Sequence, residues 1–399
     1  MEKTFLGFKR ADGSVGIRNY VLIIPAQGNL RMLAQKICDF VPDTKTTYFP
    51  WEIGRSKADR EVMARTFIGL GSNPNVSSVL VLGIEGAGFE ELKADRIQEG
   101  IAKTGKRTEM LILSKDENIF DAMEKSIKIV RELVLDASKE RRQPFGLESL
   151  AIGVKCGYSD TTSGISGNPV VGKVFDEIVK NGGKAFFSES PEIIGGEHIV
   201  TKRAKNKEVA NKLIAAAKGF EEKALSVGED IRAINPMPAN KEAGISTLEE
   251  KTFGAIMKSG SSVIEDVLEY AKIPKKGGLY FIDTTPICEL YIGLAAAGAQ
   301  LMLFQVGTNA IALNLKPDGS GGVIMPISYI TGNKATYEKQ QDNFDFNSGP
   351  LFDDISKIDE YRDGLLNKIL DLCSGTKTKV ETAASYQERI ELYLQDPVF

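Results

Sequence analysis

The feature that most constrains this chain is a regular alternation of short β-branched runs and helical patterns along its first 137 residues. Four runs have the length and composition of buried strands: Tyr20–Pro25, Lys45–Phe49, Ser78–Gly83 and Glu109–Leu113. Because the runs alternate with helical patterns, four βα units succeed one another. That order predicts a parallel sheet wrapped by helices.

A second α/β section follows the charged, proline-ended segment Ser138–Pro144, which indicates a linker. We expect strands at Leu150–Lys155, Lys184–Ser188, Leu279–Asp283 and Leu301–Gln305, and helices near 169–181, 205–226, 286–298 and 354–372. A chain of 399 residues exceeds the usual size of one hydrophobic core. We therefore predict two consecutive α/β, Rossmann-like domains with mainly parallel sheets, at 1–143 and 144–399, the second with long irregular insertions at about 227–260 and 307–325.

The composition argues against several classes of protein. A net charge of -4, with basic and acidic residues interspersed, provides no basic surface for nucleic acid. The chain has no apolar run long enough for a membrane helix, no export signal and no Cys-x-x-Cys pair. It also lacks the ordered glycine signature of a dinucleotide site and any Walker sequence. We expect a cytoplasmic protein that uses no nucleotide and has no membrane or nucleic-acid partner.

The densest polar loop, Lys155–Pro169, lies between a predicted strand and a predicted helix. In open α/β sheets ligands gather at the carboxyl ends of strands, so this loop is a candidate site. Free backbone N–H groups at a helix start suit a carboxylate, sulfonate or phosphate. A turn that merely caps the helix near Pro169 explains the same residues equally well.

The segment that follows the next predicted strand holds Glu189, Glu192, Glu197 and His198, the single histidine of the chain. Carboxylate oxygens and an imidazole are ligands for a divalent metal that polarises a substrate. The alternative is that the acidic residues compensate a helix dipole and the histidine lies on the surface.

Cys156 follows a predicted strand and adjoins Lys155, a position that lowers the pKa of a thiol. A nucleophilic cysteine needs a base, and His198 is the available histidine. A small buried hydrophobic residue is the commoner role for cysteine, and both interpretations stay open. Arg18 and Arg55 flank the first two βα units, where a guanidinium can hold an anionic group with two hydrogen bonds.

These residues resemble the altronate/galactarate dehydratase family. The resemblance covers almost the whole chain and includes the Lys155–Pro169 loop and the Glu189–His198 segment. It also includes three longer motifs, Phe8–Asn19, Asn240–Lys251 and Asp345–Gly349. Within the family the chain is most similar to the sulfolactate sulfo-lyase branch, because dehydratases of sugar acids tend to carry cysteines where this chain has Asn29, Arg55 and Gly86.

The resemblance implies a lyase that performs β-elimination on a small anionic 2-hydroxy acid with a divalent metal, Fe²⁺ by preference, or Mn²⁺ or Mg²⁺. It also implies a separate small SAF-type domain or subunit, and we expect a homo-oligomer. Two departures from the family pattern, at Val306–Asn309 and Tyr329, are expected to line the substrate site and leave the substrate open.

We assign a hypothetical role to each candidate residue from the sequence segment in which it lies. The candidate catalytic residues are Lys155, Cys156, Asp160, Glu249 and Lys251, with Asp160 or Lys155 as the base. The candidate substrate-binding residues are Arg18, Asn19, Arg55, Ser159, Thr161, Thr162, Ser163, Gly164 and Asn240. The candidate metal ligands are Glu189, Glu192, Glu197 and His198. The alternatives are a dehydratase of a sugar acid such as altronate or galactarate, and a diverged binding protein without catalysis.

Overall fold

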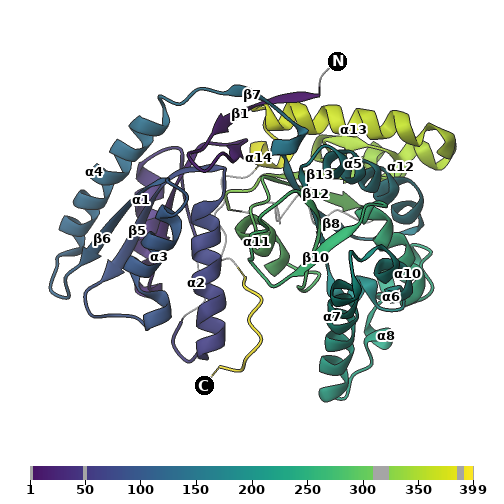
Figure 1. Cartoon of the computed structure of the whole chain (residues 1–399), viewed down its shortest axis with the longest axis horizontal. Coiled ribbons are helices and arrows are strands. Elements are labelled where there is room, and N and C mark those ends of the chain that lie inside the picture. The colour runs from purple at the N-terminus through teal and green to yellow at the C-terminus, as the bar shows by residue number, and fades with distance from the viewer. Residues whose placement is uncertain (1–2, 48–51, 309–322, 384–390, 399) are drawn as a thin grey trace.

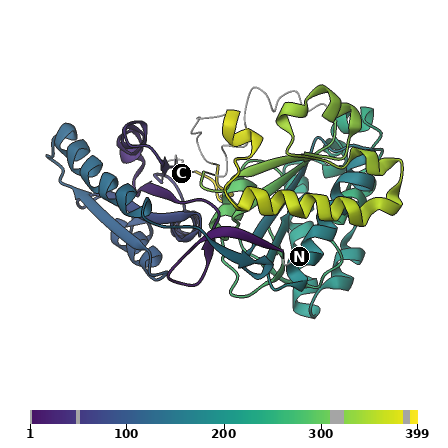
Figure 2. The same cartoon turned by 90° about the horizontal axis from the view of Figure 1, so that it is seen from above.

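A computed structural model of the chain describes residues 3–47, 52–308, 323–383 and 391–398. Over these ranges the chain forms two lobes that lie side by side, each built on a parallel sheet (Figures 1 and 2). The predicted α/β class is therefore confirmed.

The first lobe contains a four-stranded parallel sheet in the order β4-β3-β5-β6. Its strands are β3 (Tyr20–Pro25), β4 (Thr44–Thr46), β5 (Val76–Ile84) and β6 (Arg107–Leu113). Val21 and Ile23 pack against α1 (Arg31–Phe40) and α4 (Ile119–Ala137) on one face. The alternate residues Leu22 and Ile24 pack against α2 (Lys57–Ser72) and α3 (Ala94–Ala102) on the other. Each of the four predicted runs overlaps one of these strands, although Tyr48 and Phe49 of the second run lie outside the described residues.

The second lobe contains a seven-stranded parallel sheet in the order β10-β11-β9-β8-β12-β13-β14. Its strands are β8 (Ala151–Gly157), β9 (Lys184–Ser188), β10 (Ile264–Leu268), β11 (Gly278–Ile282), β12 (Leu301–Val306), β13 (Ile327–Thr331) and β14 (Phe346–Asn347). The strands β9, β11 and β10 lie on one side of β8, and the later strands β12, β13 and β14 lie on its other side. The strand order reverses at this point, and such sheets bind ligands there, beyond the carboxyl ends of the strands. We did not predict β10, β13 or β14.

Helices cover both faces of this sheet. One face packs against α5 (Asn168–Lys180), α7 (Lys207–Ser226) and α13 (Ile358–Cys373), and the other against α11 (Glu289–Ala296). Helix α11 also packs on α2, so the two lobes share one hydrophobic core. The approach is close, because a Cβ atom at Gly69 would collide with the carbonyl of Ala296. The shorter helices include α6 (Glu197–Val200), α12 (Lys334–Lys339) and α14 (Lys379–Ala383).

A small antiparallel sheet joins the lobes. It consists of β1 (Thr4–Lys9), β2 (Val15–Gly16) and β7 (Gln143–Gly146), so the segment predicted as a linker ends in a strand. Phe5, Val15 and Ile17 belong to the core of the second lobe. At the other end of the chain, the yellow segment 391–398 runs beside α2 (Figure 1), and the N–H of Gln395 donates to Asp59.

The predicted irregular insertion at 227–260 is wrong in detail, because it forms three short helices: α8 (Ile231–Ile234), α9 (Pro238–Glu242) and α10 (Leu248–Ile256). The side chains of Asp230 and Thr247 cap the first and the last of them, a local signal that the sequence carries. Most of the second insertion, 309–322, lies outside the described residues. Among the described helices, none combines the length and the hydrophobicity needed to cross a bilayer.

Candidate functional site

The polar loop after β8 is a capped helix start. The Asp160 carboxylate accepts hydrogen bonds from the backbone N–H of Ser163 at 2.9 Å and the hydroxyl of Thr162 at 2.6 Å, and Asn333 donates to its other oxygen. The chain is helical from Thr161 onward and passes through a π-helical turn, Ser163–Gly167, into α5. A protein carboxylate therefore caps the helix start where we predicted an anionic ligand. Capping is thus observed at the helix start near Thr161 rather than near Pro169, and anion binding by this loop stays a prediction.

A cavity of about 290 Å³ lies between this loop and α10. Four of the predicted substrate-binding residues line it, namely Ser159, Thr161, Ser163 and Gly164, together with the predicted catalytic residues Asp160 and Lys251. Gly164 faces Gly254 of α10 so closely that a Cβ atom would lie 3.0 Å from the Cα of Gly254. The remaining lining residues are Ile165, Asn168, Ile245, Glu250, Phe253, Gly254 and Ala255.

Behind the wall of the cavity lies a buried group of four charged side chains, which we call the charge cluster: Lys155, Glu189, Glu192 and Lys258. Glu189 follows β9 with a left-handed backbone (φ 76°), a strained conformation that concentrates at functional sites. Its carboxylate accepts from the N–H of Cys156 at 3.2 Å and lies 3.5 Å from the Lys155 ammonium. Burial and the neighbouring Glu192 raise the pKa of Glu189.

Lys258 lies between the two carboxylates of the charge cluster. Its ammonium donates to Glu189 and, at 2.5 Å, to Glu192. Burial acts to lower the pKa of Lys258, but the two carboxylates outweigh it and raise that pKa above its ordinary value. Burial likewise acts to raise the pKa of Glu192, but the ammonium groups of Lys258 and Lys251 hold it below its ordinary value. We did not predict a role for Lys258, although a lysine directly after the apolar run Phe253–Met257 is a signal that could have found it.

The predicted metal ligands do not assemble. Glu189 and Glu192 are buried on Lys258, whereas His198 is exposed and its ring packs edge-on against Phe253. In the part of the chain that the structure describes, no three His, Cys, Asp or Glu side chains are arranged to hold a metal ion. The reason is that an ammonium group already neutralises the two buried carboxylates, so the predicted four-ligand set does not fit a metal in this arrangement. The requirement for Fe²⁺ or another divalent metal stays a prediction.

Cys156 does not have the environment of a nucleophile. Burial, with a further contribution from Glu192, raises the pKa of its thiol to about 11, so the thiol stays protonated at neutral pH. Its sulfur contacts the hydroxyl of Ser159 and the side-chain oxygen of Gln305, both at 3.2 Å. The exposed His198 does not serve as its base, so the catalytic role predicted for Cys156 is not supported.

The helical segment 231–256 brings three predicted residues to different places. Asn240 is buried and donates to the carbonyl of Ser159 at 2.9 Å, which holds this segment over the polar loop. Lys251 lines the cavity and donates to Asn235. Glu249 instead forms an ion pair with Arg232 on the outside of the segment, so the structure does not support its predicted catalytic role.

Arg18 lies away from this site. Its guanidinium donates to both carboxylate oxygens of Glu381 and to the carbonyls of Ile17, Leu372 and Thr376. All five donors are thus used within the protein, and none is left for a substrate. The neighbouring Asn19 donates to the carbonyl of Ala137 and likewise lies between the lobes. The predicted substrate contact of Arg18 is therefore not supported, and that of Asn19 stays a prediction.

Arg55 precedes α2 in the first lobe. It lies 3.7 Å from Asp59, and among the described residues no hydrogen bond or ion pair joins it to the charge cluster or to the cavity. Its predicted substrate role stays a prediction. Of the two departures from the family pattern, Val306 and Tyr329 are buried in the core and do not line the cavity. Gly307 lies against the cavity residues Asp160 and Ser163, because a Cβ atom there would approach both to 2.8 Å, and Asn309 lies outside the described residues.

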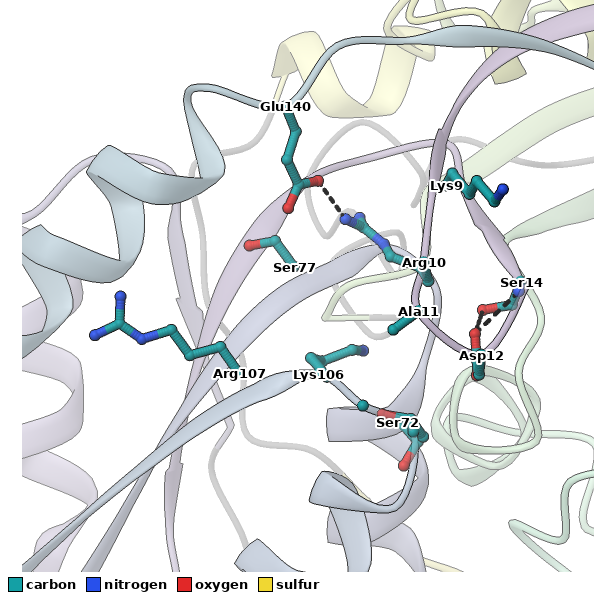
Figure 3. Close-up of a pocket in the computed structure, with 12 residues that line it drawn as sticks. Lys9, Arg10, Ala11, Asp12, Ser14, Ser72, Ser77, Lys106, Arg107 and Glu140 are labelled. Carbon is teal, nitrogen blue, oxygen red and sulfur yellow. Dashed lines mark hydrogen bonds and ion pairs between the residues drawn. The ribbon is translucent and has the colours of Figure 1, made fainter.

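A second pocket, of about 190 Å³, lies between the β1–β2 turn and the start of β6 (Figure 3). Arg10 contacts Glu140 and two backbone carbonyls, and Lys106 donates to the carbonyls of Gly71 and Asn73. These donors are engaged, and the pocket lies at the amino ends of β5 and β6, the edge opposite to the one where such sheets bind ligands. We therefore place the candidate site at the cavity of the second lobe.

Two family models match the chain. One describes the second domain of D-galactarate dehydratase/altronate hydrolase and covers residues 7–138. The other describes the C-terminal domain of D-galactarate/altronate dehydratase and covers residues 147–394, which include the charge cluster and the cavity.

Several characterised proteins are similar to this chain over most of its length. The (2R)-sulfolactate sulfo-lyase subunit beta of Chromohalobacter salexigens is 31% identical over 389 residues, 95% of each chain. The altronate dehydratase of Bacillus subtilis is 31% identical over 386 residues, 94% of this chain and 74% of the relative. The galactarate dehydratase (L-threo-forming) of Escherichia coli is 27% identical over 417 residues, 99% of this chain and 77% of the relative. The chain belongs to the D-galactarate/altronate dehydratase family.

Proposed function

We propose that the chain is a lyase that eliminates a leaving group from C3 of a small anionic 2-hydroxy acid, with (2R)-sulfolactate as the preferred substrate. The observation that carries the proposal is the cavity at the carboxyl edge of the second sheet, backed by two lysines and two carboxylates in the charge cluster. The similarity to a sulfolactate sulfo-lyase subunit supports this choice of substrate.

The reaction needs a base for the C2 proton and a cation for the enediolate that develops. Lys155 is the better candidate for the base, because its Nζ makes two long hydrogen bonds, 3.4 Å to the carbonyl of Cys156 and 3.5 Å to Glu189, and otherwise lies over the Phe304 ring. Asp160, the other candidate, accepts four hydrogen bonds from the protein. The Lys251 ammonium on the cavity wall holds the substrate carboxylate.

With these roles the reaction balances. In this step Lys155 acts as a neutral amine, which takes the C2 proton and becomes an ammonium. The C2 electron pair forms the C2–C3 double bond, and the C3–S bond breaks with its electrons leaving on sulfite. The enol then takes a proton at C3 and becomes a 2-keto acid. Glu189, beside Lys155, stabilises the charge that the lysine gains.

The second candidate is a dehydratase of a sugar acid, in which the C3–O bond breaks and water leaves. It is favoured by the relatives named altronate and galactarate dehydratase. We also propose that the chain acts with a separate small subunit, because the sulfo-lyase relative is named as one subunit of an enzyme. A cytoplasmic location and a homo-oligomer stay predictions.

The test is to purify the chain from cells that produce it, with any bound subunit, and supply (2R)-sulfolactate, altronate or galactarate with Fe²⁺, Mn²⁺ or Mg²⁺. We expect sulfite and pyruvate from sulfolactate. Release of a 2-keto-3-deoxy acid from a sugar acid would favour the second candidate, and no product from any of the acids would contradict a lyase. The variant Lys155→Met should lose turnover by more than about 100-fold while the acid still binds.

A further inference from the structure

One buried acceptor in the cavity wall has no partner. Asn168 is fully buried at the start of α5 and lines the cavity, and its Oδ1 has no hydrogen-bond partner among the described residues. Its amide Nδ2 donates to the carbonyl of Gly254 at 2.9 Å. That bond fixes which end of the amide carries the oxygen, because the reverse orientation would set two acceptors against each other.

A buried acceptor without a donor is costly, so its partner is expected to come from the molecule that fills the cavity. A carboxylate or a sulfonate has no proton to donate, and an acceptor oxygen repels it. A hydroxyl can donate. The charged ends of an acid find Lys251 on the same wall.

We propose that Asn168 recognises the substrate through its hydroxyl group, which donates a hydrogen bond to Oδ1. This inference rests on the proposed function. It adds that two different side chains of the cavity bind the two ends of the substrate: Lys251 binds the anionic group and Asn168 binds the hydroxyl. It also selects the ligand class: an anionic acid that carries a hydroxyl, in preference to the same acid without one. Asn168 belongs to the polar loop Lys155–Pro169, but we predicted no role for it from the sequence.

The experiment compares matched ligands by calorimetry on the purified, complete protein. One pair is (2R)-sulfolactate and 3-sulfopropanoate, which lacks the hydroxyl, and the other is altronate and its 2-deoxy analogue. The members of a pair have equal charge, so the ratio of their affinities isolates the hydroxyl. The unaltered protein should prefer the hydroxy acid of at least one pair by about tenfold or more. If it prefers neither, the inference is overturned.

Two variants of the same position sharpen the result. Asn168→Leu has a similar size but no acceptor, and should reduce the preference to within about twofold of unity. Asn168→Asp keeps an acceptor oxygen, so both affinities should fall through charge repulsion while their ratio survives. Ile245→Val, elsewhere on the cavity wall, alters shape without polarity and should leave the ratio unchanged.

If Asn168→Leu retains the full preference, Asn168 is not the hydroxyl acceptor. Thermal unfolding of each variant confirms that it is folded before its ratio is used. A failed turnover assay combined with a preserved preference would reject the lyase reaction but leave hydroxyl recognition standing. Turnover without any preference for the hydroxyl would support the lyase reaction but reject hydroxyl recognition by Asn168.

Discussion

Two buried ion-pair groups in this molecule, Arg18 with Glu381 and the charge cluster, have similar compositions. They differ in how many hydrogen-bond donors are already used within the protein. Arg18 and Glu381 lie between the lobes, and every donor of the guanidinium is bound within the protein. The charge cluster lies near a cavity, and the two hydrogen bonds of its Lys155 are long, at 3.4 Å and 3.5 Å.

The difference teaches how to separate a structural charge from one available for chemistry. Burial and ion pairing are common to both groups and distinguish nothing. Spare hydrogen-bonding capacity does distinguish them: all five donors of Arg18 are used within the protein, whereas the hydrogen bonds of Lys155 are long. We expect the Arg18–Glu381 pair to support stability and the charge cluster to support both stability and turnover.

The largest expected effect comes from removing the central cation of the charge cluster. Lys258→Met leaves two carboxylates buried without a counter-charge, and should reduce the free energy of unfolding by about 4–5 kcal/mol and abolish turnover. Urea denaturation measures the first effect and the product assay the second. Adding Glu189→Gln and Glu192→Gln should restore much of the stability but no turnover. If the single variant is as stable as the parent, Lys258 does not neutralise the pair.

Breaking the other group should affect stability alone. Arg18→Leu leaves the partly buried Glu381 unpaired and should cost about 3 kcal/mol of unfolding free energy. In the folded fraction, kcat and KM should stay within about twofold of the parent, because Arg18 has no donor left for a substrate. Glu381→Gln is the matched control and should behave alike. A tenfold rise in KM for Arg18→Leu alone would return Arg18 to the substrate site.

The same pair predicts a pH dependence. Burial acts to raise the pKa of Glu381, but its hydrogen bonds and ion pair with Arg18 outweigh burial and place that pKa below its ordinary value of 4.5. A lowered pKa in the folded state contributes stability above pH 4.5, the value expected in the unfolded chain. That contribution is lost as the pH falls further through the folded value. The stability difference between the parent and Glu381→Gln should therefore shrink as the pH falls below 4.5, and a constant difference would contradict the assignment.

The smallest effect is expected outside both groups. His198→Ala removes an exposed ring that packs against Phe253, and should change the unfolding free energy by less than about 0.5 kcal/mol. Metal content after purification and turnover should be unchanged. A clear loss of bound metal in this variant, but not in a variant of another exposed residue such as Lys207→Ala, would reinstate His198 as a ligand.

Local patterns determined much of the architecture. The β-branched runs predicted β3, β5, β8, β9, β11 and β12 to within a few residues, because alternation and turn residues act over short distances. The loop after β8 was identified as polar and as preceding a helix, and it does line the cavity. The strands β10, β13 and β14 were missed, and β14 is only two residues long.

Local sequence patterns were thus enough to predict the order of the elements, the fold class and the segments from which the site is built. Which charges meet became known from the packing of the two lobes. Lys258 reaches Glu189 across 69 positions, and Arg18 reaches Glu381 across 363. The physical reason is that the partner of a buried charge depends on how the sheets and helices pack, and no local pattern encodes that distance.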